Sequence, residues 1–251
     1  MSLSTSAFLV ALGLIPSLVW VLIFLRNDRH PEPKYLITKT FLMGIIVSPL
    51  AIILQLGFIA LHPWFNLSIL NAQSPSFFVW AALVEEVVKY LAVRTVVLKN
   101  PEFDEPVDAM VYMMVAGLGF AAIENILVLF RTIPDGTTIL LATWGLRSVG
   151  ATLLHALASS LVGYFLAISW FFQAHHKKLL IVGISVATFF HFVFNMFLSN
   201  VDSRINGLAY AIGLLIIMLF LVSILFAKIK SRKPQPMTKA MLIPQTEITV
   251  A

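Results

Sequence analysis

The sequence predicts an all-α protein, a polytopic bundle of about seven transmembrane helices, and three observations carry this prediction. Hydrophobic residues make up 59% of the 251 residues and charged residues only 12%, where soluble domains have roughly 25% charged residues. Seven apolar runs are long enough to cross a hydrocarbon layer about 30 Å thick. The basic residues lie mainly between alternate runs, as in multi-pass membrane proteins. A water-soluble globule, a coiled coil and a disordered chain are thereby excluded.

The predicted spans cover residues 3–25, 36–61, 76–98, 107–130, 139–172, 178–199 and 205–227. We interpret the first as a retained helix, bent at Pro16, because no basic residue precedes Arg26 and no small-residue cleavage site follows the run. The fifth is too long for one perpendicular span. Gly145 and Gly150 predict that it begins with an interfacial or bent piece, and an eighth short segment is the alternative there.

The Lys and Arg residues predict the orientation in the cell membrane. With the N-terminus outside and the C-terminus cytoplasmic, thirteen of the 17 basic residues fall on the cytoplasmic side, and only Arg131 and Arg204 lie in outer loops. Lys89 and Arg147 lie within spans. This asymmetry is the one that the positive-inside rule expects, and it favours an odd number of spans.

Two domains are expected: a transmembrane bundle over residues 1–227, with its motif-bearing core at about 76–200, and a basic cytoplasmic tail over residues 228–251. The tail is basic and polar from Lys228 and carries Pro234 and Pro236, so we expect it to be disordered. Its lysines suit anionic membrane lipid better than nucleic acid, which we do not expect as a partner. The chain has no cysteine, which excludes disulfides, thiolate metal sites and a cysteine nucleophile.

Ionisable side chains within the spans are the candidates for function, because each costs roughly 2.5–3.5 kcal/mol to insert at the bilayer centre. They and their polar neighbours are Glu85, Glu86 and Lys89 in the third span, Glu124 and Asn125 in the fourth, His155 in the fifth, and His191 and Asn195 in the sixth. At 1.5 Å per residue, Glu85, Glu124 and His191 lie about 14, 9 and 12 Å below the outer surface. His155 lies about 26 Å above the inner face. One shared polar cavity in the outer half is therefore expected.

Spacing within each helix agrees with a shared cavity. Lys89 follows Glu86 by three residues and Glu85 by four, so that one ammonium group can reach either carboxylate. His191 and Asn195 are also one turn apart. Each group has a structural alternative: the Glu–Lys set as a buried ion pair that fixes packing, and each histidine as a packing residue bonded to a carbonyl. Asn125 and Ser159 suit interhelical hydrogen bonds, and Arg147 suits the outer interface.

Two carboxyl groups and two histidines can hold a water molecule, and a carboxylate removed from water is a competent general base near neutral pH. This is the outline of water-mediated amide hydrolysis. No HExxH or GxSxG motif is present. We expect no cofactor, although the residue types also allow a zinc site. Glu85 and Glu86 point about 100° apart on a helix, so they are not expected to bind one ion together.

Four segments, taken in order, resemble the PrsW intramembrane proteases, which belong to a superfamily with the type II CAAX prenyl endopeptidases. The EExxK motif is matched at 85–89 and the FxxxE motif at 120–124. A single histidine on a later helix matches His155, and the following histidine with Asn or Asp one turn later matches His191 and Asn195. Glu124 stands where the prenyl endopeptidases have histidine, which favours the PrsW proteases.

The resemblance implies an intramembrane endopeptidase that cuts a single-pass membrane protein near its outer boundary, with the first cleavage of an anti-sigma factor as the known role. It implies Glu85 as the general base, assisted by Glu124 and His155, and leaves open which glutamate is the principal base. It further implies that His191 and Asn195 stabilise the oxyanion and that Lys89 neutralises Glu86.

Two other functions remain compatible with the residues. A proton- or ion-coupled transporter also carries buried Glu and His, although neither inverted repeats nor broken midplane helices are evident. A non-catalytic scaffold that binds a single-pass partner is the third.

Overall fold

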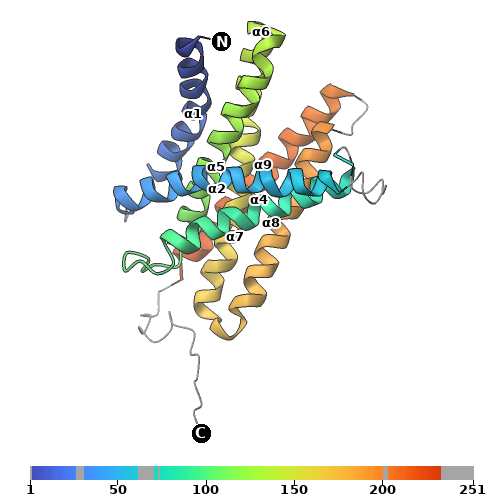
Figure 1. The fold of residues 1–251 in the computed structure, drawn as a ribbon. Coiled ribbons are helices and arrows are strands. Elements are labelled where there is room, and N and C mark those ends of the chain that lie inside the picture. Colours follow the sequence, from blue (N-terminus) through green and yellow to red (C-terminus); the bar gives the residue numbers. More distant parts are fainter. Residues whose placement is uncertain (1, 27–30, 62–70, 73, 200–202, 233–251) are drawn as a thin grey trace.

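The computed structural model describes residues 2–26, 31–61, 71–72, 74–199 and 203–232, and every regular element in these ranges is helical. The α-helices are α1 (Leu3–Leu25), α2 (Lys34–Ala60), α4 (Pro75–Val96), α5 (Asp108–Thr132), α6 (Thr137–Val149), α7 (Ala151–Phe171), α8 (His176–Ser199) and α9 (Arg204–Lys230). Two short 3₁₀ turns, η2 (Ile133–Asp135) and η3 (Gln173–His175), precede α6 and α8. In Figure 1, α2 and α4 lie side by side and cross the direction of α7 and α8.

The prediction of a multi-pass helical membrane protein is confirmed. Six helical segments among the described residues are long and apolar enough to cross a membrane. The remaining predicted span is α4, whose 22 residues include four charged side chains, Glu85, Glu86, Lys89 and Arg94. These charges lower its apolar character below that of the other spans. The helix nevertheless packs within the bundle, against α2, α5, α7 and α8.

Several predicted boundaries are also confirmed. The fifth run divides into α6 and α7 at Gly150, whose φ of −85° and ψ of −88° are not helical. At the start of α4, the Ser74 hydroxyl accepts a hydrogen bond from the backbone N–H of Phe77, and Pro75 occupies the first helical position, an arrangement typical of helix N-termini. The predicted end of the last span is too early, because α9 continues past residue 227 to Lys230. Residues 233–251 of the predicted tail lie outside the described residues.

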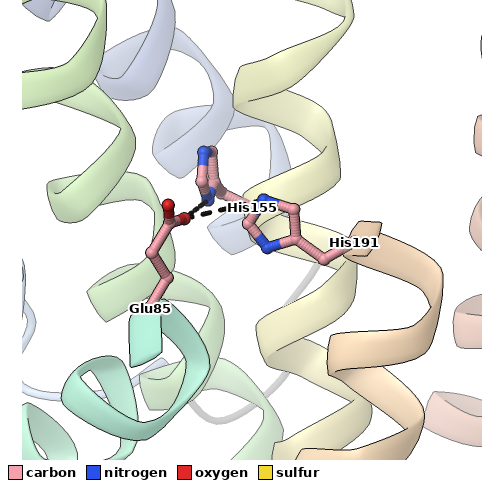
Figure 2. Close-up of side chains that lie close together, drawn as sticks. All are labelled: Glu85, His155 and His191. Atoms are coloured by element: carbon pink, nitrogen blue, oxygen red, sulfur yellow. Dashed lines mark ion pairs between the residues drawn. The ribbon is translucent and has the colours of Figure 1, made fainter. Parts of the chain in front are cut away.

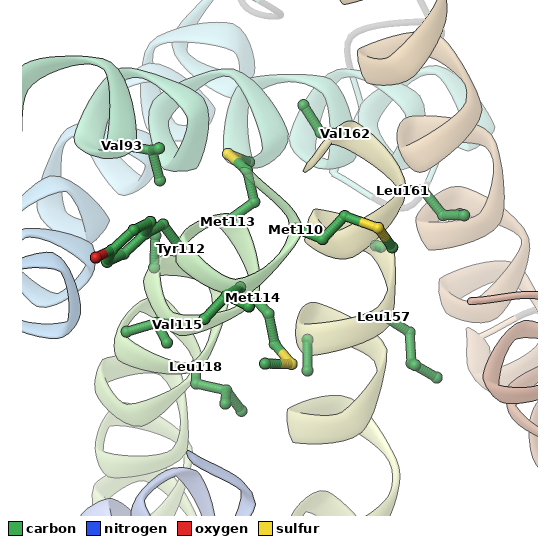
Figure 3. Close-up of a cluster of buried hydrophobic side chains, with 14 of the residues drawn as sticks. Val93, Met110, Tyr112, Met113, Met114, Val115, Leu118, Leu157, Leu161 and Val162 are labelled. Atoms are coloured by element: carbon green, nitrogen blue, oxygen red, sulfur yellow. The ribbon is translucent and has the colours of Figure 1, made fainter. Parts of the chain in front are cut away.

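The two central helices are α5 and α7, which pack closely against each other, with α1 and α2 outside α5 and with α8 and α9 outside α7. Figure 3 shows the apolar core between them. Met110 and Met114 of α5 point toward α7, and Leu157 and Leu161 extend from the far side of α7, all within one cluster of buried residues. Flexible methionine side chains fill irregular gaps of this kind. The core holds α5 and α7 at the fixed separation that their polar residues require.

Helices α2 and α5 cross at close range because each presents a glycine to the other. A Cβ atom at Gly119 would overlap the carbonyl oxygen of Phe41, and one at Gly44 would overlap the carbonyl oxygen of Ala116. Small residues at such contacts let membrane helices approach backbone to backbone. This crossing fixes α2, and with it Gln55, relative to the polar residues of α5.

Gly119→Val is therefore expected to destabilise the protein, since overpacking a close contact costs about 1–3 kcal/mol. The melting temperature in detergent, followed by tryptophan fluorescence, should fall. Gly213→Val on α9 is the matched control, because a Cβ there meets no atom within 4 Å. An unchanged melting temperature for Gly119→Val would contradict the backbone contact.

Candidate active site

Helix α4 contributes a buried carboxylate–ammonium cluster. The Lys89 ammonium donates to Glu86 Oε1 over 2.7 Å and lies 3.8 Å from Glu85 Oε2. All three residues are buried. The Ser159 hydroxyl of α7 donates to the other oxygen of Glu86 over 3.3 Å. Glu86 is thus satisfied at both oxygens, as a buried charge must be to remain in a membrane interior.

His191, on α8, joins the two glutamates. Its Nδ1 lies 3.0 Å from Glu86 Oε1, and its Nε2 lies 3.6 Å from Glu85 Oε2. Because the Glu86 carboxylate can only accept, we assign the N–H to Nδ1. In the neutral ring, the lone pair of Nε2 then faces Glu85.

His155, on α7, is held from both sides. Its Nδ1 lies 2.8 Å from the Lys89 ammonium and its Nε2 lies 2.9 Å from Glu124 Oε2. An ammonium group can only donate and a carboxylate can only accept, so Nδ1 accepts and Nε2–H donates. This chain of contacts connects the Glu–Lys motif of α4 to the glutamate of α5.

Of the two glutamates on α4, Glu85 is the one with an oxygen that accepts no hydrogen bond from the described residues. Its Oε1 accepts a hydrogen bond from Gln55 of α2 over 2.9 Å. Its Oε2 is buried and accepts no hydrogen bond from the described residues, although it lies 3.6 Å from His191 Nε2 and 3.9 Å from His155 Nδ1. Figure 2 shows the carboxylate turned toward both imidazole rings. Two acceptors, Glu85 Oε2 and His191 Nε2, therefore face one small space.

Such a pair suits a water molecule, which has two protons to donate. Two O–H···acceptor bonds of about 2.8 Å span more than the present 3.6 Å, so the two side chains must open slightly to admit it. Bound in this way, the water keeps its oxygen lone pairs free for attack on a carbonyl carbon.

The other end of the network is more open. Arg147, on α6, lies 3.2 Å from Glu124 Oε2 through Nη2 and donates from Nε to Asn125 Oδ1 over 2.8 Å. The side chains of Glu124 and Arg147 are 27% and 21% exposed, whereas that of Glu85 is 7% exposed. The prediction that Arg147 lies near the outer interface stays a prediction; in addition, its guanidinium group pairs with the carboxylate that holds His155.

The structure thus brings Glu85, Glu86, Lys89, Glu124, His155 and His191 into one hydrogen-bonded and ion-paired group. Asn195 is partly exposed one turn after His191, and among the described residues no hydrogen bond or ion pair joins it to this group. Asn125 donates to Thr152 of α7 over 2.9 Å, as expected of an interhelical hydrogen bond.

Sequence reasoning missed Gln55, which orients the candidate base. The sequence does mark Gln55, because it is the one amide side chain in the otherwise apolar second half of its span, residues 49–60. A lone glutamine in a membrane helix, however, gives no indication of its partner.

Glu85, His155 and His191 could also hold a metal ion, since one ligand atom from each lies within 4.8 Å of the others. Two histidines and a glutamate form a known ligand set of catalytic zinc. The far nitrogens of His155 and His191 face Glu124 and Glu86, an arrangement common around metal-bound histidines. The residue set therefore fits a metal ion, with one competing feature: the Lys89 ammonium occupies the lone pair of His155 Nδ1.

An all-helical membrane bundle that encloses glutamates and histidines in one hydrogen-bonded group fits a class of protein, the intramembrane hydrolases. The sequence comparisons give the particular family. A profile described as "PrsW family intramembrane metalloprotease" matches residues 32–225, and the chain belongs to this family.

Similar proteins carry the same name. The chain is 29% identical over 196 residues to "Protease PrsW" of Oceanobacillus iheyensis, which covers 78% of this chain and 85% of that protein. It is 28% identical to the proteins of the same name from Geobacillus kaustophilus, over 76% of this chain and 79% of that protein, and from Clostridioides difficile, over the same shares. No solved structure matches at a comparable level of significance. The chain is accordingly a multi-pass membrane protease.

Proposed function

We propose that this protease hydrolyses a peptide bond of a single-pass membrane protein, near the outer boundary of the membrane, with a water molecule activated by Glu85. The observation that carries the proposal is the Oε2 of Glu85, which is buried opposite His191 and accepts no hydrogen bond from the described residues. A positioned carboxylate of this kind contributes as a general base when it lies within hydrogen-bond reach of the water.

The proposed reaction uses the contacts described above. Glu85 takes a proton from the water as its oxygen bonds to the carbonyl carbon. The proton then passes to His191 Nε2, 3.6 Å away. With the Asn195 amide, the protonated ring donates to the oxyanion, and it delivers the proton to the amine nitrogen when the C–N bond breaks. Lys89 keeps Glu86 ionised, and Glu124 holds His155.

A divalent metal ion bound by Glu85, His155 and His191 would supply Lewis-acid activation of the water and the carbonyl. We propose the metal-free reaction, because Lys89 donates to the histidine nitrogen that a metal ion would need.

Chelation tests this choice. Purified protein treated with EDTA or phenanthroline is expected to keep its cleavage rate. Loss of activity that zinc alone restores would contradict the metal-free reaction and assign the three residues to a metal site, while leaving the protease function intact.

The proposed substrate class is the membrane-anchored protein, and by the resemblance a membrane-bound anti-sigma factor is the candidate within it. A Glu85→Gln protein should retain its substrate, which can be purified with it from membranes. The captured protein should be cut by reconstituted wild-type protease without any ion gradient. Binding without cleavage by the wild type would instead favour a scaffold, and gradient-dependent transport would favour a transporter.

The proposed orientation has the N-terminus outside and the C-terminus in the cytoplasm, with the basic end of α9, Lys228 and Lys230, against anionic lipid. A reporter fused after Ala251 is expected to be active only if it is of a type that functions in the cytoplasm. Activity of a reporter that requires export would contradict the orientation.

A further inference from the structure

An apolar groove of about 560 Å³ lies between α6 and α9. Val149 of α6 and Ile212 and Leu215 of α9 are among the residues that line it, and most of the others are also aliphatic. Its volume is in the range of about 300–1,000 Å³ that is usual for ligand sites. The space therefore suits a few apolar side chains rather than a whole helix.

The floor of the groove adjoins the active site. Phe194 follows His191 by three residues on α8, and Ala151 precedes His155 by four residues on α7, so each lies about one helical turn from a histidine. Both line the groove. Arg147 lines it as well and binds Glu124. Both helices that carry the active-site histidines, α7 and α8, thus contribute to the lining of the groove.

The exposed end of the active site faces the same way. Glu124 and Arg147 are more exposed than the glutamates of α4, and Arg147 forms part of the groove wall. The groove reaches this end of the network through Arg147, which lines it and pairs with Glu124. A chain that enters from the lipid through the groove meets Arg147 first and the Glu124–His155 pair next.

We propose that the α6/α9 groove is the docking site for the transmembrane segment of the substrate. Apolar side chains of the substrate helix fill the groove, in the manner of a helix laid into an apolar groove, and its unwound outer end continues past Arg147 to Glu85. The proposal rests on the proposed protease function. It deepens that function by assigning the place where the substrate binds.

Gly145 allows the groove to be filled without disturbing the protein. It lines the groove, and a Cβ atom there meets no heavy atom within 4 Å. Gly145→Trp should therefore occupy the space intended for the substrate. Gly57→Trp on α2 is the matched control, because its Cβ position is equally open and it does not line the groove.

Binding is measured separately from cleavage. The probe is a fluorescent peptide of the transmembrane segment captured by the Glu85→Gln protein, titrated in detergent micelles. Adding Gly145→Trp to Glu85→Gln should weaken binding about tenfold or more, and Gly145→Trp alone should lower cleavage similarly. Gly57→Trp should change neither. Equal binding and cleavage for Gly145→Trp and Gly57→Trp would overturn the groove while leaving the protease function established.

Cross-linking gives a second measurement that does not depend on the tryptophan variants folding. The chain has no cysteine, so Ile212→Cys in the Glu85→Gln protein provides a unique thiol in the groove. It should form a disulfide with a cysteine in the transmembrane part of the probe, whereas Ile53→Cys on the exposed face of α2 should not. Cross-linking at Ile53 alone would place the substrate elsewhere. If Gly145→Trp displaces only co-purified lipid and not the probe, the groove is a lipid site and the proposal fails.

Discussion

Glu85→Gln is expected to lower peptide-bond cleavage by about 10²-fold or more, the loss typical of removing a general base. The amide has nearly the same shape as the carboxylate, so it can keep the hydrogen bond to Gln55. It cannot take a proton from water. The loss should therefore appear in kcat, while the melting temperature and the affinity for substrate remain close to those of the wild type.

Glu102→Gln is the matched control for this variant. Glu102 is exposed between α4 and α5, so the same chemical change there should leave cleavage unaltered. Cleavage at the wild-type rate by folded Glu85→Gln protein would remove Glu85 from the role of base and leave Glu124 as the remaining candidate.

His191→Ala should reduce cleavage to a similar extent, by about 10²-fold or more. The substitution removes the acceptor that faces Glu85 and the N–H that holds Glu86. The attacking water then loses one of its two partners. His175→Ala, at an exposed histidine just before α8, should have no effect. A His191→Ala protein that folds and cuts normally would contradict the water position assigned here.

A double-variant cycle tests whether His155 and Glu124 act as one unit or contribute to cleavage independently. His155 and Glu124 are bonded to each other at 2.9 Å, and directly bonded residues are not additive. His155→Ala and Glu124→Gln together should cost little more than the larger single effect. Additive losses would show that the two residues act separately.

The fold could be predicted largely from the sequence because a membrane restricts the possible structures. Backbone groups in a bilayer must be satisfied internally, so an apolar run of sufficient length is a helix. The break at Gly150 followed from a length that one span could not accommodate. Whether α4 crosses the membrane was harder to judge from hydropathy, because Glu85, Glu86 and Lys89 lower its apolar character. The helix is nevertheless packed against four others.

The candidate site was predictable to the extent that charge in a membrane is costly. Glu85, Glu124, His155 and His191 stood out for that reason, and their common position in the outer half of the membrane predicted their proximity. Gln55 and Arg147 did not stand out. Neither residue implies a large free-energy cost of insertion, because the amide of Gln55 is uncharged and the sequence places Arg147 near the membrane interface. Only the packing of α2 against α4, and of α6 against α5, brings them to Glu85 and Glu124.

The most direct test of the account is mass spectrometry of the two cleavage products formed by purified protease in water labelled with oxygen-18. Glu85-dependent attack by water at a site in the outer half predicts a label in the new carboxyl terminus and a cut near the outer boundary of the substrate helix. It also predicts about 10²-fold less product, or lower still, with Glu85→Gln. Unlabelled carboxyl termini, or a cut at the cytoplasmic end of the helix, would contradict it.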